Sequence, residues 1–387
     1  MKSEAVRPSF ASSAAPSFAP NQSLSASVPI TTEAPAAPVE TLRHRILLLA
    51  TDFVTPYRVL RCIQATGAEV YVLGNSGAGA LRLSRHCRHF AISGHIIHGA
   101  RDEELALEIN CFAKEFGITL VVPADAPSAR FLIASQDLIR TTCFALPRLE
   151  HFDALNNKWS FTQLCKQLGL RHPETRLFPD LETLRDVISS GGVEFPSIVK
   201  PLDRCAGAGI KVLGDPSAQL NTINYRPILM QTFIPGEDIG ASIFARGGKI
   251  EAFLAHRLHR GVYSTFHDGN IHADLAKLVE HLGLDGVYNF DMITALDGST
   301  YYLECNPRFF YKINLSMIAG INFVEWGIPG GRPSAGAVPS GTAVRFPKAL
   351  LRSLLSLHRC SIRDWQMARY LLSDPWPLLF EKLKVLS

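Results

Sequence analysis

Residues 287–308 read VYNFDMITALDGSTYYLECNPR, in which two runs of β-branched and aromatic residues flank Asp297-Gly298. An Asp-Gly pair between such runs is a strong sequence signal for a β-hairpin. If Asp297 and Gly298 are the two loop residues, Leu296 faces Ser299 and the strands pair outward from there. The segment therefore predicts an antiparallel hairpin.

The same register places Asp291 opposite Glu304 and Asn289 opposite Asn306, and Arg308 shares their face because side chains alternate along a strand. Like charges across a strand pair destabilise a sheet unless a positive group lies between them. Mg²⁺ is commonly held by carboxylate and amide oxygens, with phosphate oxygens and water completing the octahedron. The hairpin predicts a magnesium site, with a solvated strand face as the alternative. The opposite face is expected to be apolar, with Tyr288, Phe290, Met292, Leu303 and Cys305.

The bulk composition is that of a globular protein with two or three packed units, since the chain has 387 residues and is 47% hydrophobic. Its net charge of +4 is modest and gives no reason to expect a nucleic-acid or membrane partner, while anionic small substrates remain open. No apolar run approaches the roughly 20 residues that span a bilayer.

The eight cysteines are scattered, and most lie in apolar contexts. They are typical of core thiols in a reducing compartment, so a cytoplasmic location is expected and a disulfide framework is not. They are Cys62, Cys87, Cys111, Cys143, Cys165, Cys205, Cys305 and Cys360.

Residues 1–42 are rich in Ser, Ala and Pro and predict a disordered tail. A targeting peptide is the alternative, although the segment has no apolar core and contains Glu4, Glu33 and Glu40.

Residues 43–150 alternate short apolar strands with helical periods, which predicts a parallel sheet with right-handed crossovers. The first strand is followed by Thr51-Asp52-Phe53 where a dinucleotide site needs a Gly-x-Gly-x-x-Gly turn, so dinucleotide binding is not expected. Strands are expected at 46–50, 69–73 and 118–123, helices after Pro56 and over 102–116, and a flexible loop at 75–79.

Two lysines stand where a helix begins and where an apolar strand ends. Lys158 opens a helix that closes at Gly169, and Lys200 follows the apolar run 195–199. A lysine that a buried strand aims into a cleft needs an anion. Residues 203–210, DRCAGAGI, predict a small-residue loop whose N–H groups could close over phosphates, with an ordinary hairpin turn as the alternative.

The next segments combine a strand over 228–234, the acidic pair Glu237-Asp238, and a hairpin over 240–255. The basic run 256–260, HRLHR, is interpreted either as a solvated face or as a cradle for an anionic substrate. A helix is expected at 272–282, a Gly/Pro linker at 327–339, and helices at 349–357 and 362–372 that pack or bind a partner.

Taken in order and spacing, these features resemble the ATP-grasp superfamily over residues 43–330. The resemblance implies an α/β and α+β architecture, in which an ATP-grasp fold is preceded by a Rossmann-like domain and followed by a helical extension. The implied domains are 43–150 (Rossmann-like), 151–330 (ATP-grasp, two lobes) and 331–387 (linker and helical tail). The basic run leading into 261–266 looks closest to carbamoyl-phosphate-synthase-like members.

The resemblance also implies a role for each matching residue. Arg308 would stabilise the transition state, and Asp291, Glu304 and Asn306 would bind magnesium. The nucleotide would be bound by Lys158, Lys200, Gly207, Gly209, Gln231, Phe233, Ile234 and Asp238, with Glu237 as the alternative to Asp238. Within this set Gln231, Phe233 and Ile234 would contact the adenine, and Asp238 or Glu237 the ribose. The acceptor substrate would be bound by His256, Arg257 and Arg260.

The implied activity is ATP-dependent ligation, in which a carboxylate becomes an acyl phosphate and an amine then displaces phosphate. ATP and Mg²⁺ are the expected cofactors, with Mn²⁺ as an alternative metal. The partners would be a small carboxylate and a small amine, and a homodimer is left open. Another ATP-grasp chemistry, such as a carboxylase or phosphotransferase, and a non-catalytic nucleotide-binding protein remain alternatives.

Overall fold

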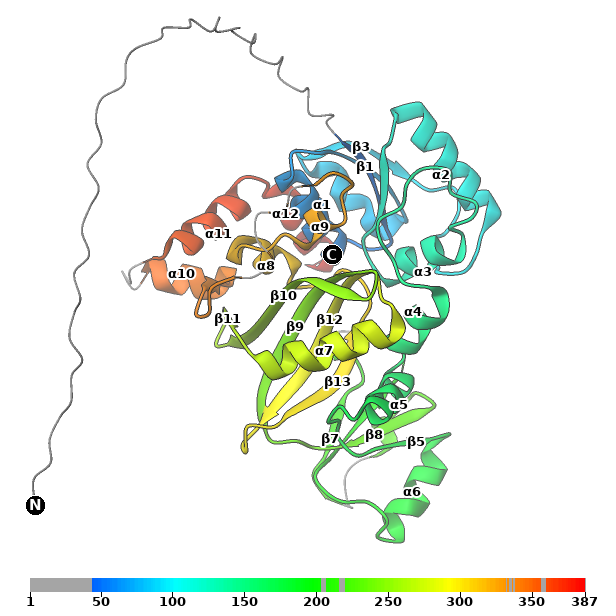
Figure 1. Ribbon diagram of the computed structural model, residues 1–387, viewed down its shortest axis with the longest axis vertical. Coiled ribbons are helices and arrows are strands. Elements are labelled where there is room, and N and C mark those ends of the chain that lie inside the picture. Colours follow the sequence, from blue (N-terminus) through cyan, green and yellow to red (C-terminus); the bar gives the residue numbers. More distant parts are fainter. Residues whose placement is uncertain are drawn as a thin grey trace, which may run out of the picture. The chain divides into compact units, whose positions relative to one another are not determined.

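The computed structural model describes residues 44–202, 207–215, 220–331, 333, 336, 338–355 and 360–386, which belong to one compact unit. The tail expected at 1–42 lies outside these residues. The described residues form three sheets with helices packed around them (Figure 1). None of their helices combines the length and the apolar character that crossing a membrane requires.

The first sheet is parallel, as expected, with strand order β3-β2-β1-β4. Helix α1 begins two residues before Pro56, because a proline in the first turn has no N–H that needs an intrahelical partner. Residues 76–83 form a 3₁₀-helix where a flexible loop was expected, and the strand at 87–92 was not expected. The elements are β1 Arg45–Ala50, α1 Val54–Ala65, β2 Glu69–Gly74, η1 Ser76–Leu83, β3 Cys87–Ile92, α2 Glu103–Phe116, β4 Leu120–Pro123 and α3 Ala126–Ala134.

Two helices lead into a smaller antiparallel sheet of order β5-β8-β6-β7. Its buried side is an apolar core that includes Phe178, Val199, Ile228 and Met230. The elements are α4 Leu149–Asn156, α5 Lys158–Leu168, β5 Thr175–Phe178, α6 Leu181–Ser189, β6 Ser197–Pro201, β7 Lys211–Leu213, η2 Leu220–Thr222 and β8 Ile228–Thr232.

The largest sheet has the order β13-β12-β9-β10-β11-β14, and α5 and α7 contribute to the apolar core on one of its faces. The hairpin expected over 240–255 is present and longer than expected, as β9 and β10. The elements are β9 Gly236–Arg246, β10 Lys249–His259, β11 Val262–Phe266, α7 Gly269–Leu282, β12 Gly286–Ala295, β13 Thr300–Asn306 and β14 Ala343–Arg345.

The β12–β13 hairpin has the expected pairing of Asp291 with Glu304, but it reaches that pairing by a different route. The turn is one residue longer than expected, because Thr294 pairs with Thr300. A bulge at Leu303 then adds one residue to β13 and restores the register. The longer turn and the bulge therefore compensate for each other, so that Asp291 still pairs with Glu304.

The bulge also corrects the expected apolar face. Tyr302 takes the place assigned to Leu303, since Tyr302 is buried in the same core as Phe290 and Met292 while Leu303 is only half-buried. A bulge residue opposes no single partner and leaves the strict alternation of the strand. The other expected apolar residues, Tyr288 and Cys305, lie in that core.

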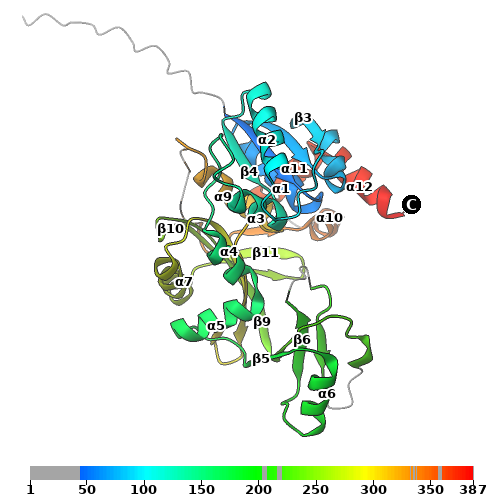
Figure 2. The ribbon, with the colours of Figure 1, turned by 90° about the vertical axis from the view of Figure 1, so that its right-hand side faces the viewer.

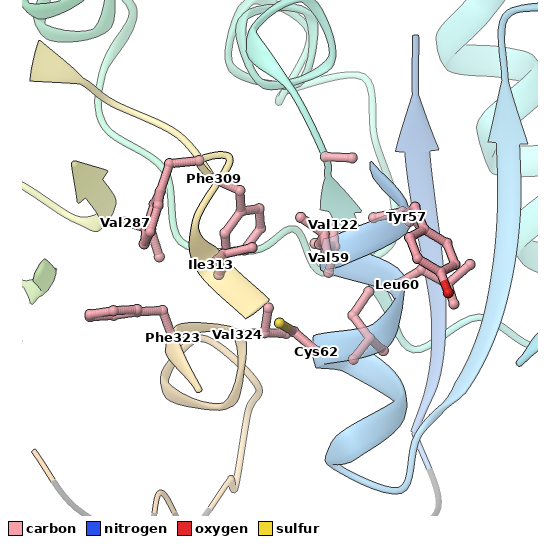
Figure 3. Close-up of a cluster of buried hydrophobic side chains, with 14 of the residues drawn as sticks. Tyr57, Val59, Leu60, Cys62, Val122, Val287, Phe309, Ile313, Phe323 and Val324 are labelled. Atoms are coloured by element: carbon pink, nitrogen blue, oxygen red, sulfur yellow. The ribbon is translucent and has the colours of Figure 1, made fainter. Parts of the chain in front are cut away.

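A third apolar core joins the first sheet to the segment that follows the hairpin. Figure 3 shows Cys62 of α1 pointing toward Val324, with Ile313 and Phe323 close by, and all four side chains are buried. Here α1 packs on α8 (Ile313–Ala319) and α9 (Phe323–Trp326). The domain limit expected near residue 150 stays a prediction, and this core is continuous on both sides of it.

The chain ends in three helices, α10 Pro347–Leu355, α11 Ile362–Leu372 and α12 Trp376–Leu386, drawn in orange to red in Figure 2. They are linked to α1 and to the end of η1 through buried Asp374, whose carboxylate lies 3.9 Å from Arg61 Nη1 and accepts a hydrogen bond from Ser84 Oγ at 2.6 Å. The Tyr57 hydroxyl donates to the Asp374 carbonyl oxygen at 2.8 Å. This extension is therefore part of the folded unit.

Candidate active site

Asp291 lies at the centre of the candidate site. Each of its two carboxylate oxygens accepts a hydrogen bond from the side-chain amide of an asparagine. Asn289 Nδ2 donates to Oδ1 and Asn306 Nδ2 donates to Oδ2, both at 3.2 Å. Asn289 is itself oriented by the Ser242 hydroxyl, which donates to Asn289 Oδ1 at 3.0 Å. The antiparallel pairing of β9, β12 and β13 places these side chains in neighbouring rows on one face.

The two opposed acids have different protonation behaviour. Burial, followed by the charge of Glu304, raises the pKa of Asp291 to about 6. Burial alone would raise the pKa of Glu304 as well, but the charges of Lys158 and Lys200 outweigh it and bring that pKa below its ordinary value. Near neutral pH the pair therefore gains or loses a proton at Asp291, while Glu304 stays ionised.

Lys158 and Lys200 approach this pair from two other elements. Lys158 is the first residue of α5, where Asn157 caps the helix, and its Nζ lies 3.4 Å from Glu304 Oε2 and 3.5 Å from the Leu202 carbonyl oxygen. Lys200 is buried in β6 at 5% exposure. The structure therefore brings together both lysines and both acids that the sequence singled out.

The side chain of Lys200 is a buried cation that makes no hydrogen bond or ion pair within the described residues. Burial lowers its pKa to about 8, an effect that Glu304 opposes and Lys158 reinforces. Burying a charged group without a partner costs free energy, which an anionic ligand would offset. The side chain is thus placed to receive an anion.

Arg308 follows β13 and contacts the same polar row. Its Nη1 donates to Asn306 Oδ1, and its backbone N–H donates to the Asn306 carbonyl oxygen at 2.8 Å. The Asn306 side chain is therefore held between Arg308 and Asp291. Its amide oxygen faces the guanidinium, so metal binding through that oxygen would require it to leave Arg308.

A second group of residues lies beside Asp291, of which His256 was expected from the sequence while Gly240 and Lys312 were not. Gly240 pairs with Asp291 on one side and His256 on the other, and a Cβ at Gly240 would lie 2.7 Å from His256 Cε1. The glycine therefore makes room for the His256 ring, which is fully buried and stacked on Tyr263 with 4.7 Å between ring centroids. A glycine inside a strand often marks such a close approach, and this signal was available in the sequence.

The His256 ring lies against Lys312, which follows the expected site residues by only four positions. His256 Nε2 is 3.5 Å from Lys312 Nζ. Burial, followed by the charge of Lys312, holds the His256 pKa well below its ordinary value, so the ring is neutral and Nε2 accepts from the ammonium. Lys312 also acts to lower the pKa of Asp291. It is a further cation of the site.

The basic run 256–260 is divided by the sheet and does not form one cradle. His256 lies on the face of Asp291, whereas alternation places Arg257 on the opposite face. There Arg257 pairs with Glu237 at 3.0 Å and covers the Phe266 ring. Arg260 lies in the β10–β11 turn with a φ of 48°.

The same alternation separates the two acids considered for the ribose. Asp238 pairs with Ile293 and lies on the face of Asp291, and it is exposed. Glu237 lies on the other face, in its ion pair with Arg257. The geometry favours Asp238 of the two.

The strand expected to contact the adenine is the central strand β8 of the smaller sheet. Gln231 is buried, and its Nε2 donates to Thr175 Oγ1 at 3.0 Å, which orients the amide and leaves Oε1 available as an acceptor. The Phe233 N–H is occupied by the Pro196 carbonyl oxygen at 3.1 Å. A nucleotide contact at Phe233 would therefore use its carbonyl oxygen. Both Phe233 and Ile234 follow the end of β8, which is two residues shorter than expected.

The expected small-residue loop is described only in part, because residues 203–206 lie outside the described residues. Gly207 and Gly209 have φ values of 75° and 83°, which favour glycine. A Cβ at Gly209 would meet Pro201 and Tyr225 at 3.2 Å, and its carbonyl oxygen accepts from the Tyr225 hydroxyl at 2.8 Å. Both glycines are thus suited to their backbone, whatever their role toward phosphate.

The donor set fits a divalent cation that also contacts a phosphorylated ligand. Among the described residues, no three His, Cys, Asp or Glu side chains cluster closely enough to hold a metal ion by themselves. Asp291, Glu304 and the Asn306 amide provide three oxygen donors at most, so a magnesium ion would need phosphate and water oxygens to complete its octahedron. The raised pKa of Asp291 fits a site in which a cation replaces a proton.

Comparison with known proteins gives one family match. Residues 224–342, which include β8 to β13, match the family model described as ATP-grasp in the biosynthetic pathway with Ter operon. The comparison with curated proteins gives no significant match.

Several solved structures share the fold over most of their length. An ADP complex of N5-carboxyaminoimidazole ribonucleotide synthetase has a TM-score of 0.59 at 13% identity, over 77% of this chain and 80% of that chain. An L-amino acid ligase from Bacillus licheniformis has a TM-score of 0.55 at 16% identity, over 78% of both chains. The biotin carboxylase domain of Hydrogenobacter thermophilus 2-oxoglutarate carboxylase, with MgADP and bicarbonate, has a TM-score of 0.54 at 16% identity, over 76% of this chain and 70% of that chain.

Proposed function

The chain has the ATP-grasp fold, and on that premise we propose that it is an ATP-dependent ligase that activates a carboxylate as an acyl phosphate and transfers the acyl group to an amine. One observation carries the proposal. Lys158, Lys200, Asp291 and Glu304 come from four elements and meet in one electrostatic cluster, in which the buried cation Lys200 makes no ion pair within the described residues. Such a cluster is suited to a triphosphate and its metal ion.

The metal ligands in this proposal are Asp291, Glu304 and the amide oxygen of Asn306. When bound, Mg²⁺ would neutralise phosphate charge and orient the terminal phosphates for transfer. Asn289 and Ser242 hold the Asp291 carboxylate in place through hydrogen bonds, so they act as positioning residues. Two of the similar structures contain ADP, and one of them also contains magnesium, which supports the choice of ATP and Mg²⁺. Mn²⁺ remains an alternative.

The lysines and Arg308 carry the transfer step in this proposal. Lys158 and Lys200 would bind phosphate oxygens and keep the terminal phosphate in line with the attacking carboxylate oxygen. That oxygen forms a bond to the γ-phosphorus as the bond to the β,γ-bridging oxygen breaks, which yields an acyl phosphate and ADP. Arg308 would then stabilise the tetrahedral oxyanion that forms when the amine attacks. The released phosphate takes the bonding electrons, and the amine loses a proton.

Lys312 is the group we assign to the carboxylate substrate. Its ammonium has the neutral His256 ring as its hydrogen-bonding partner and faces the row that contains Asp291. With Lys158, Lys200 and Arg308 it makes four cations against two acids, an excess that favours an anionic substrate beside the nucleotide. Arg257, which the resemblance assigned to the acceptor substrate, lies on the opposite face in an ion pair with Glu237 and is less suited to contact that substrate.

The other functions considered for this site are separated by the same assay. Phosphate release from ATP would be measured with a panel of carboxylic acids, each with and without a panel of amines. Release that requires both supports the ligase. Release that requires bicarbonate and no amine indicates a carboxylase, and nucleotide binding without any release indicates a non-catalytic protein. Assignment to a carbamoyl-phosphate-synthase-like branch and a cytoplasmic location stay predictions.

Glu304→Gln tests the metal site in that assay. The substitution keeps the shape of the side chain and removes a charged oxygen donor, so turnover should fall by at least about 100-fold while the fold is retained. Asp297→Asn is the matched control, because Asp297 is an acid of the same hairpin that bonds only Ser299 in the turn. Equal activity in the two variants would remove Glu304 from the proposed machinery.

A further inference from the structure

The helices α11 and α12 present apolar side chains to solvent in a helical pattern. On α11 the exposed apolar residues are Ile362, Trp365 and Leu372, at 71%, 58% and 79% exposure, whereas Met367 and Tyr370 of the same helix are buried. On α12 they are Trp376, Leu379 and Leu383, at 65%, 48% and 56%. The spacings i, i+3 and i+7 align the α12 residues along one stripe, and i, i+3 and i+10 do the same on α11.

These stripes are unusual for a surface that only faces water. Two of the four tryptophans of the chain lie in them. Single exposed apolar residues are ordinary on a protein surface, but repeated large apolar side chains on successive helices mark an interaction site. Helix α11 is attached to the rest of the fold, because Arg363 Nη1 donates to the Ile318 carbonyl oxygen at 2.9 Å and Arg345 pairs with buried Asp364.

The C-terminal segment that contains α10, α11 and α12 is strongly basic. Residues 347–387 contain seven Lys and Arg against three Asp and Glu, an excess equal to the net charge of +4 of the whole chain. Two of the three acids, Asp364 and Asp374, are buried inside the fold. Among the described residues of α10 to α12 no exposed side chain is acidic, and the exposed basic ones are Lys348, Arg352, Arg369 and Lys382.

We infer that the outer side of α10, α11 and α12 docks on an anionic lipid surface. Tryptophan and leucine side chains enter the boundary between headgroups and acyl chains, and Lys and Arg beside them are attracted to anionic headgroups. The small net charge of the chain gave no reason to expect a membrane partner, but that charge is concentrated here. The inference is independent of the proposed catalytic function.

A second copy of this chain is a poorer occupant of the surface. A two-fold contact through these helices would bring the same basic side chains of both copies together, and like charges oppose such a contact. The 42-residue N-terminal tail has two basic and three acidic residues, so its charge offers little complementarity. An anionic bilayer matches both the apolar stripes and the basic charge.

The test uses the full-length protein and vesicles of phosphatidylcholine with or without 30% phosphatidylserine. Sedimentation should show binding to the anionic vesicles alone, and tryptophan emission should shift to the blue. Arg369→Glu with Lys382→Glu should weaken binding by roughly tenfold or more, since each reversed charge loses an attraction worth about fivefold. Trp365→Ala with Trp376→Ala should abolish the blue shift. Lys249→Glu and Leu296→Ala, both exposed elsewhere, are the matched controls and should bind normally.

Circular dichroism would first show that each variant is folded. Absence of binding to anionic vesicles at low salt would overturn the inference, as would equal binding to neutral vesicles. A dimer in sedimentation velocity that is lost in the Trp365→Ala, Trp376→Ala variant would assign the surface to a second copy. A change in tryptophan emission on removal of residues 1–42, without vesicles, would assign it to the tail. Either result would replace the lipid partner.

Discussion

Metal binding at the hairpin should depend on pH through Asp291. Because its pKa is raised to about 6 while that of Glu304 is lowered, the metal-free site holds a proton on Asp291 at pH 5 and loses it by pH 7. A divalent cation must displace that proton. Affinity should therefore fall by about tenfold for each pH unit below 6 and reach a plateau above pH 7, so that it rises roughly tenfold between pH 5 and pH 7.5.

Mn²⁺ binding measured by electron paramagnetic resonance without nucleotide is the suitable assay, because phosphate groups also titrate near pH 6. Calorimetry in buffers of different ionisation enthalpy should show about three quarters of a proton released per ion at pH 5.5 and almost none at pH 7.5. Asp297→Asn should behave as the wild type, since Asp297 lies in the exposed turn. An affinity that is the same at pH 5 and pH 7.5 would refute the assignment of the proton to Asp291.

Three further perturbations follow from the same geometry. Asp291→Asn should stabilise the metal-free protein by roughly 2 kcal/mol at pH 7 but not at pH 4. The reason is that the raised pKa makes the folded protein less stable once the pH rises high enough to charge the buried carboxyl group. Urea unfolding at both pH values checks this. Lys200→Met should weaken ADP binding by roughly tenfold or more without lowering the unfolding free energy, with Lys249→Met as control in calorimetry. Gly240→Ala should lower the free energy of unfolding in urea by about 1–3 kcal/mol, because the added Cβ meets the His256 ring. Gly269→Ala is the control, since nothing lies within 4 Å of its Cβ. Equal losses in the two variants would contradict the close approach of His256 to Gly240.

The cations of the site form two groups by their proposed roles. Lys158 and Lys200 lower the pKa of Glu304, and Lys200 also interacts with Asp291, whereas Lys312 lowers the pKa of Asp291 and is held by His256. The first group serves the phosphates in our proposal and the second serves the carboxylate substrate. Tyr311 connects the second group to the first sheet, because Arg58 of α1 lies over its ring, 3.3 Å from the centroid, and donates to its carbonyl oxygen. The loop that precedes Lys312 is therefore supported from α1.

The sequence determined the local features of this protein. The hairpin followed from its Asp-Gly pair and the β-forming runs beside it, and strand alternation placed Asp291 and Glu304 on one face. The parallel first sheet and the helix at 362–372 followed from short-range apolar patterns. These properties depend on residues that are close in the chain, so they can be read without coordinates.

Only the tertiary structure decided which distant side chains meet and which face each one takes. The bulge at Leu303 cancelled the error in the turn, and the assignment of Arg257 and Asp238 to opposite faces depended on pairing across three strands. The contact of Lys312 with His256 depends on the fold, because the two residues are 56 positions apart and the His256 ring occupies the space above Gly240. Burial, which sets the pKa of Asp291 and Lys200, is a property of packing and not of neighbours in the chain.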